Sequence, residues 1–257
     1  MNRTIFRNAA LVAVGITCLA ATALPALAEE EKPTADLTVG AYSSYIWRGY
    51  ELNDNSLVIQ PSMTVGYKGF SANLWGNLDT DVTADDAKNW TETDLTIAYD
   101  TAFDKIGVGA GYIYYGLDGA DDTQEIYAKI SYDCILSPSL TIYRDYDAYN
   151  GWYYSFGIGH SLPITDTINL DLGASIGYLD VDDAATMADS SGNAYSEFHD
   201  GVLSASASIP VAKYLTITPT VRYSFGLSNE AEDYLDANNP SGDNNILYGG
   251  VSASFAF

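Results

Sequence analysis

Apolar and polar residues alternate along most of the chain, in segments of about ten residues separated by turn-forming residues. The last segment is the clearest example. One parity holds Leu247, Gly249, Val251, Ala253, Phe255 and Phe257, and the other holds Tyr248, Gly250, Ser252, Ser254 and Ala256. Two-residue alternation puts successive side chains on opposite faces of a strand. The pattern therefore predicts strands that each carry one apolar and one polar face.

The same alternation recurs in eleven further segments, so we predict 12 strands. These segments are 37–47, 57–67, 70–74, 95–99, 106–114, 126–132, 140–142, 152–158, 168–178, 203–209 and 215–225. The first of them includes Tyr45 and Trp47, which we expect in an aromatic girdle at one end of the strands.

The connections between these segments alternate in length. Short ones lie at 68–69, 100–105, 133–138, 161–167 and 210–214, and longer ones at 51–56, 79–90, 116–123, 179–200 and 226–245, with 147–151 brief. Short turns at one end and long loops at the other are typical of outer-membrane barrels. We predict an all-β fold over 37–257, a transmembrane antiparallel up-and-down β-barrel with both termini in the periplasm.

The N-terminal region has the layout of a cleavable signal peptide over 1–28. Arg3 and Arg7 precede an apolar run that ends in Ala26-Leu27-Ala28. A retained anchor helix is the alternative, but Pro25 interrupts the end of the run. Residues 29–36 then form a short N-terminal segment ahead of the barrel. The chain is thus expected in the outer membrane of a Gram-negative bacterium.

The other end of the chain favours the same location. A terminal aromatic residue, Phe257, on an alternating strand is the kind of signal that the barrel assembly machinery of the outer membrane reads, whereas a soluble β-sandwich would not account for it. Outer-membrane lipid and lipopolysaccharide are the expected surroundings, and the 21 tyrosines suit two interfacial girdles.

Charge and cysteine content exclude several functions. The formal net charge of −23 falls to −25 when the two positive charges of Arg3 and Arg7 leave with the signal peptide. So acidic a chain repels phosphate backbones, which excludes nucleic-acid binding. Cys134 is the sole cysteine after residue 28, so no internal disulfide can form.

Assigning the apolar parity to lipid turns a set of charged and aromatic residues into the lumen, because charges facing lipid are costly. The lumen-lining candidates are Arg48, Trp75, Glu92, Asp94, Glu125, Tyr127, Lys129, Asp171, Arg222 and Tyr248. Small residues on the same parity, such as Gly109 and Ser204, leave space. Arg48 and Arg222 are expected to form a basic patch opposite the acids. Pairing of these charges into a plug is the alternative.

Catalysis and metal binding have weak support. His160 and His199 fall at opposite ends of the predicted barrel, and neither has the neighbours of a nucleophile–base pair, although Ser196 and Asp200 lie near His199 in sequence. The acidic runs at 180–183 and 118–122 lack the spacing of a calcium loop. We therefore predict no catalytic residues, no metal site and no cofactor.

Residues 42–50, Tyr-Ser-Ser-Tyr-Ile-Trp-Arg-Gly-Tyr, followed by Gln60, Gly69-Phe70-Ser71 and Leu74-Trp75-Gly76-Asn77, resemble the TorF-type porins, a gammaproteobacterial outer-membrane β-barrel family. The likeness covers about residues 37–79, with a second similar element at 138–143. It implies a porin with an aromatic-Arg-Gly element on the first strand. It does not identify a solute.

Together these features predict a narrow channel for passive diffusion of small polar solutes, with a preference for cations and with residues 179–200 as its gate. The alternative is a non-conducting barrel that presents the acidic loops 179–200 and 226–245 to a ligand or a surface partner.

Overall fold

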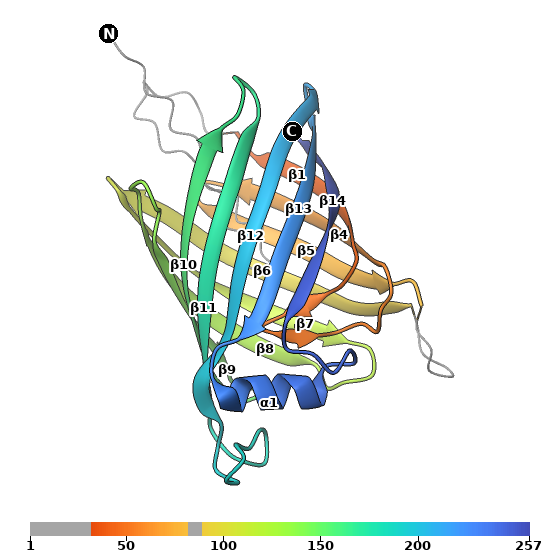
Figure 1. Ribbon diagram of the computed structural model, residues 1–257. Helices are drawn as coiled ribbons and strands as arrows, with labels where there is room; N and C mark the ends of the chain where they lie inside the picture. The colour runs from red at the N-terminus through yellow and green to blue at the C-terminus, as the bar shows by residue number, and fades with distance from the viewer. Residues whose placement is uncertain (1–31, 82–88) are drawn as a thin grey trace.

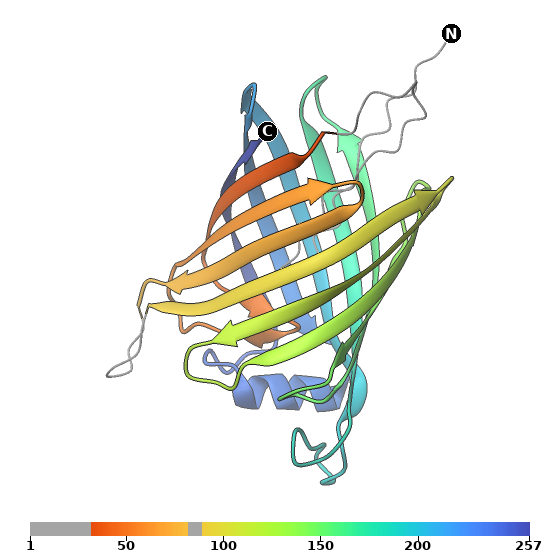
Figure 2. The same ribbon diagram turned by 180° about the vertical axis from the view of Figure 1, so that it is seen from behind.

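The computed structural model describes residues 32–81 and 89–257. These residues form a closed barrel, a small two-stranded hairpin and a helix (Figures 1 and 2). The barrel strands are β1 (Thr34–Tyr42), β4 (Val58–Tyr67), β5 (Phe70–Asp79), β6 (Trp90–Phe103), β7 (Ile106–Leu117), β8 (Thr123–Tyr132), β9 (Ser139–Asp145), β10 (Gly151–Pro163), β11 (Asn169–Val181), β12 (Ser196–Ala212), β13 (Leu215–Gly226) and β14 (Ile246–Ala256). The predicted signal peptide and residues 82–88 of the predicted loop 79–90 lie outside the described residues.

Twelve antiparallel strands close the wall, as the alternation predicts. β1 completes the circle because it pairs with β4 on one side and with β14 on the other, Leu37 lying opposite both Met63 and Phe255. β1 begins at Thr34, three residues earlier than predicted. Ala35 and Phe257 exchange backbone hydrogen bonds, so the first and last strands meet at one end of the barrel. Among the described residues no helix is long and apolar enough to cross a membrane.

The predicted parity of the wall is confirmed. On β14, Leu247, Val251 and Phe255 are exposed while Tyr248 is buried, and on β8, Ile126 and Ile130 are exposed while Glu125 and Tyr127 are buried. The outer surface is consequently a continuous apolar belt, which water disfavours and hydrocarbon tolerates.

The two ends of the barrel differ as predicted. We call the end with short connections, such as Lys68-Gly69 and 104–105, the turn end, and the opposite end the loop end. Aromatic side chains are exposed near both. The Phe70 and Tyr99 rings pack at a tilt at the turn end, with centroids 4.7 Å apart, and Tyr178 packs edge-on against Phe198 at 5.1 Å near the loop end.

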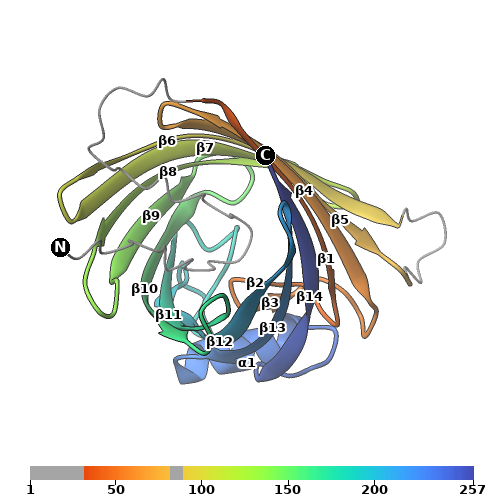
Figure 3. The same ribbon diagram turned by 90° about the horizontal axis from the view of Figure 1, so that it is seen from above.

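The prediction that the first strand continues to residue 47 is wrong beyond Tyr42. β1 ends there, and residues 46–51 leave the wall as a hairpin of β2 (Ile46–Trp47) and β3 (Tyr50–Glu51). Arg48 and Gly49 both have positive φ, 49° and 84°, which makes the two-residue turn that suits a tight hairpin. Viewed along the barrel, this hairpin lies within the ring of strands (Figure 3). Tyr45 and Trp47 therefore point into the lumen and not toward an outer girdle.

A helix that the alternation does not predict lies in the last long loop. α1 spans Asn229–Asn238, and the Ser228 hydroxyl caps it by accepting a hydrogen bond from the Ala231 amide at 3.1 Å. Glu230 and Glu232 in its first turn suit the positive end of the helix dipole. Ala231 and Leu235 are fully buried, so α1 packs across the loop end under β12 and β13 (Figure 1).

Candidate functional site in the barrel lumen

The tip of the β2–β3 hairpin makes a buried ion pair with the barrel wall. The Arg48 guanidinium donates two parallel hydrogen bonds to the two carboxylate oxygens of Glu125 on β8, at 2.7 and 2.8 Å. The Tyr115 hydroxyl on β7 donates to the same carboxylate at 2.9 Å. Both charged side chains are almost fully enclosed, with 11% and 2% of their surface exposed. This bidentate geometry fixes the direction of the hairpin tip.

Aromatic rings surround the same guanidinium. Its central carbon lies 4.4 Å from the Trp47 ring centroid, 4.9 Å from that of Tyr143 and 4.2 Å from that of Tyr153. Burial by itself lowers the pKa of Arg48, but the facing Glu125 carboxylate more than offsets this and holds the pKa above its ordinary value. Arg48 therefore stays charged, and cation–π contacts add to its attachment.

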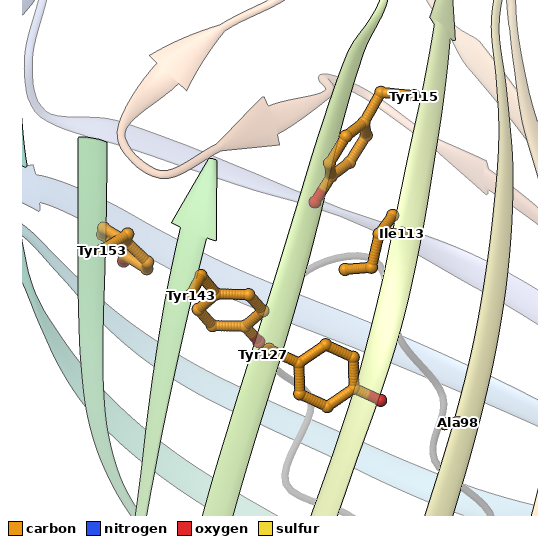
Figure 4. Close-up of a cluster of buried hydrophobic side chains, with 6 residues drawn as sticks. All are labelled: Ala98, Ile113, Tyr115, Tyr127, Tyr143 and Tyr153. Atoms are coloured by element: carbon orange, nitrogen blue, oxygen red, sulfur yellow. The ribbon is translucent and has the colours of Figure 1, made fainter. Parts of the chain in front are cut away.

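The tyrosines belong to a cluster on the inner wall. Ala98, Ile113, Tyr115, Tyr127, Tyr143 and Tyr153 come from five neighbouring strands, β6 to β10, and form a buried layer inside the barrel (Figure 4). The Tyr127 and Tyr143 rings lie 5.6 Å apart and the Tyr143 and Tyr153 rings 6.0 Å apart. This layer fills one side of the lumen next to the hairpin.

The base of the hairpin is fixed by one asparagine. The Asn53 side-chain oxygen accepts hydrogen bonds from the Tyr45 amide at 2.6 Å and from the Ser44 hydroxyl at 2.9 Å, and its side-chain nitrogen donates to the Ser56 carbonyl at 2.8 Å. Asn53 is buried, with only 3% of its surface exposed. Its side chain supplies hydrogen-bond partners to backbone groups where the chain turns from the wall into the lumen.

Contacts with the last loop stabilise the hairpin at the loop end of the barrel. The Asn239 side chain, just after α1, donates to the Gly49 carbonyl at 3.2 Å and accepts from the Glu51 amide at 3.0 Å. The Tyr50 ring lies 5.2 Å from His199 and 6.3 Å from Tyr234 of α1. Burial raises the pKa of the Tyr50 phenol well above its ordinary value, so it remains neutral. The hairpin and α1 thus pack against each other at the loop end of the barrel.

Gly49 is expected to be essential to this packing. An added Cβ would lie 3.0 Å from Leu235 Cδ1 and 3.2 Å from Asp200 Cβ, at a φ of +84°. We expect Gly49→Ala to lower the free energy of unfolding by about 1–2 kcal/mol from the left-handed backbone alone, and by more because of these contacts. Urea unfolding of the folded barrel in detergent, followed by tryptophan fluorescence, measures the loss.

Gly119→Ala is the matched control for that substitution. Gly119 has a φ of +90° and no atom within 4 Å of an added Cβ, so it isolates the backbone cost. Equal losses for the two variants would contradict close packing of the hairpin tip against α1.

A second group of predicted lumen residues lies on β5 and β6. Trp75 and Glu92 are buried and Asp94 is partly buried, with Asp94 paired in register with Trp75. The Tyr45 ring, at the start of the loop that carries the hairpin, packs against Trp75 with centroids 5.4 Å apart. Two carboxylates therefore face the lumen beside the hairpin without belonging to the Arg48–Glu125 pair.

On β7 the inward glycines do not leave the space that the sequence suggested. Lys129 forms an ion pair with Asp100 at 2.8 Å, and an added Cβ at Gly109 would meet both of these side chains. At Gly111 it would meet the Tyr127 ring within 2.6 Å. Larger neighbours on β6 and β8 already cover this part of the wall.

The wall from β9 to β13 is different, because small and hydroxyl-bearing side chains there border an open chamber. The chamber is open to solvent, and its empty space together with the solvent at its opening amounts to about 730 Å³. The polar and glycine residues lining it are Ser139, Thr141, Ser155, Gly157, Gly159, His160, Asp171, Gly173, Ser175, Ser204, Ser206, Thr220 and Arg222, from β9 to β13. Tyr248 is buried next to it, with its ring centroid 6.0 Å from the Arg222 guanidinium. This chamber thus lies along β9–β13.

The predicted basic patch is wrong. Arg48 is not on the wall but at the hairpin tip, where it reaches Glu125, while Arg222 lines the separate chamber. The reason is that the chain leaves the wall after Tyr42, which moves Arg48 across the lumen. Arg48 and Glu125 pair with each other, as the alternative predicts; whether this pair plugs the lumen stays a prediction.

The two histidines lie apart. His160 Nδ1 is 2.7 Å from the Ile135 carbonyl at the turn end, and buried His199 lies 2.7 Å from the Tyr195 hydroxyl at the loop end. The Ser196 hydroxyl donates to Asp180, not to His199. Within residues 32–81 and 89–257, no group of three or more His, Cys, Asp or Glu is placed to hold a metal ion.

Three tyrosines of the site are not among the predicted lumen residues. Tyr115, Tyr143 and Tyr153 surround the Arg48–Glu125 pair, and all three fall on the inward parity of their strands. The signal was present, because Tyr114-Tyr115 and Tyr153-Tyr154 are consecutive aromatic pairs, and of two consecutive strand residues one must face inward.

The barrel of this protein has the fold of twelve-stranded outer-membrane porins. The NanC porin superposes with a TM-score of 0.55 at 12% identity, covering 86% of this chain and 98% of that one. The KdgM porin superposes with a TM-score of 0.54 at 10% identity, and the match covers 87% of this chain and 99% of that one. An outer-membrane channel from Pseudomonas putida F1 superposes with a TM-score of 0.50 at 10% identity, and the match covers 90% of this chain and 97% of that one. No protein-family model and no curated protein sequence matches the chain.

Proposed function

We propose that this protein is an outer-membrane channel for passive diffusion of small polar solutes, with a preference for cations. The observation that carries the proposal is the solvent-connected chamber along β9–β13, which runs inside a closed barrel with an apolar outer belt. The resemblance of residues 37–79 to TorF-type porins and the porin-like fold support it. Expected partners are outer-membrane lipid and lipopolysaccharide, with Phe257 read by the barrel assembly machinery.

The charges in the lumen support cation preference. Glu125 neutralises Arg48, and Asp100 neutralises Lys129. Of the other charged residues predicted to line the lumen, Arg222 is basic and Glu92, Asp94 and Asp171 are acidic, so acids are in excess. A narrow, acid-lined path concentrates cations and repels anions.

Ion selectivity tests this proposal directly. Purified protein in planar bilayers under a potassium chloride gradient should give a reversal potential of cation-preferring sign, and Glu92→Gln/Asp94→Asn should move it toward zero because the lumen loses two carboxylates. Asp104→Asn/Asp133→Asn removes the same charge from exposed positions at the turn end and should change it less. Anion preference in the unaltered protein would refute the proposed selectivity.

One observation favours a second candidate, a non-conducting barrel with acidic loops for a ligand or partner. The hairpin and α1 obstruct the loop end through an ion pair, cation–π contacts and the Asn239 hydrogen bonds. Loop 182–195 packs on the hairpin as well, with the Tyr50 hydroxyl 3.5 Å from the Met187 sulfur. A barrel without the hairpin that still failed to conduct would favour this second function, and the gating role of 179–200 remains a prediction.

A further inference from the structure

We propose that the chamber along β9–β13 binds one small zwitterion of the α-amino-acid class, with its carboxylate on Arg222 and its ammonium group on Asp171. This inference rests on the proposed channel function and adds the chemical class of the solute. It is carried by two opposite charges that share a cavity without neutralising each other.

The unpaired state of Arg222 distinguishes it from the other lumen cations. Arg48 is bound to Glu125 at 2.7 Å and Lys129 to Asp100 at 2.8 Å. Within the described part of the chain, no carboxylate lies within ion-pair distance of Arg222, and no cation lies that close to Asp171. An unpaired guanidinium and an unpaired carboxylate in one chamber each favour a ligand group of the opposite charge.

The strand register sets their separation. Asp171 on β11 is level with Ser206 on β12, which is level with Thr220 on β13, and Arg222 lies two residues further along β13. Two strand spacings and two residue rises put the backbone positions on the order of 12 Å apart. Both side chains line the chamber. A backbone separation of this order leaves room between the two side chains for one α-amino acid with a hydrogen bond at each end.

The rest of the lining supports the same class of ligand. Ser204 and Ser206, on the strand between the two charges, offer hydroxyls that can donate or accept. Among the described residues that line the chamber none is Phe, Tyr or Trp, so the chamber lacks an aromatic face on which a sugar ring could stack. A singly charged solute would satisfy one of the two groups and be repelled by the other.

Three probes of similar size separate these possibilities. Alanine is a zwitterion, N-acetylalanine is an anion, and alaninamide is a cation. With full-length protein in nanodiscs, saturation-transfer NMR should detect saturable binding of alanine that exceeds binding of both analogues about tenfold, the value of one charge-assisted hydrogen bond. Liposome swelling with the same probes measures their entry.

The variants Asp171→Asn and Arg222→Gln should each reduce alanine binding about tenfold. The two variants should also differ in ligand preference. Asp171→Asn should bind N-acetylalanine more strongly than the unaltered protein does, and Arg222→Gln should bind alaninamide more strongly. A merely structural role of the two residues would not produce these opposite changes. The matched controls Asp166→Asn and Lys213→Gln remove the same charges from exposed turns outside the chamber and should bind alanine like the unaltered protein. Heat-dependent gel migration checks that each barrel is folded.

The outcomes separate this inference from the channel function. Conductance with equal weak binding of the three probes would overturn the zwitterion site and leave the channel intact. Selective alanine binding without conductance or swelling would support the site and overturn the channel. Selective binding that persisted in both chamber variants would place the ligand elsewhere and refute the assignment to Asp171 and Arg222.

Discussion

Removal of the β2–β3 hairpin should raise the single-channel conductance several-fold, because the hairpin and the rings around its tip occupy the lumen at the loop end. The design is simple, since the Leu52 amide already donates to the Tyr45 carbonyl at 2.9 Å and a Gly-Ser link can join these two residues in place of 46–51. Planar-bilayer recording of the unaltered and shortened proteins at equal salt gives the comparison.

A deletion elsewhere at the loop end controls for general loosening. Deleting Gly119 and Ala120 shortens the exposed β7–β8 connection, where Gly119 has no neighbour within 4 Å of an added Cβ. This variant should conduct like the unaltered protein. If the hairpin deletion also left conductance unchanged, the narrowest part of the path would lie outside the hairpin.

Breaking the Arg48–Glu125 pair from one side should be the most destabilising single substitution at the site. Glu125→Leu leaves a guanidinium buried among aromatic rings without its carboxylate, at an expected cost of about 3–5 kcal/mol in the free energy of unfolding. Arg48→Met/Glu125→Leu removes both charges and should recover most of that loss, since an apolar pair of similar size avoids desolvation of the ions. Urea unfolding of the single and double variants measures the coupling.

The chain contains a matched pair for comparison. Arg144 and Asp182 form the same bidentate contact at 2.8 and 2.6 Å, but 22% and 41% of their side-chain surfaces are exposed. Arg144→Met should cost at most about 1 kcal/mol, because solvent screens the exposed pair. Similar losses for Glu125→Leu and Arg144→Met would show that burial does not strengthen the inner ion pair.

The wall of the barrel was predictable because lipid and lumen impose a two-residue period on every strand. Leu247 and Tyr248 follow that rule, and the rule needs no knowledge of neighbouring strands. The chamber was predictable only in part. Ser204 and Gly157 lie on the inward parity and line it, but Gly109 and Gly111 are covered by residues whose positions depend on register across the sheet.

The hairpin escaped prediction because it has the same period as the strand before it. Tyr45 and Trp47 continue the alternation of Val39 and Ala41, although the chain has already turned out of the wall. Arg48-Gly49 lacks the Asn-Gly or Asp-Gly signature that is common in two-residue turns. The ion pair that stabilises the positive φ of Arg48 is made with Glu125, which lies 77 residues away in sequence. Its placement depends on a contact that local pattern cannot reveal.

The hydrogen bonds of Asn239 also bear on the order of assembly. They join the first loop of the barrel to the last, across 190 residues, and Leu235 packs at the same point. The Arg48–Glu125 ion pair needs only β8, whereas the contacts of Asn239 and Leu235 with the hairpin need the last loop in place. The hairpin is thus attached to both halves of the chain, and only its second attachment depends on the last loop.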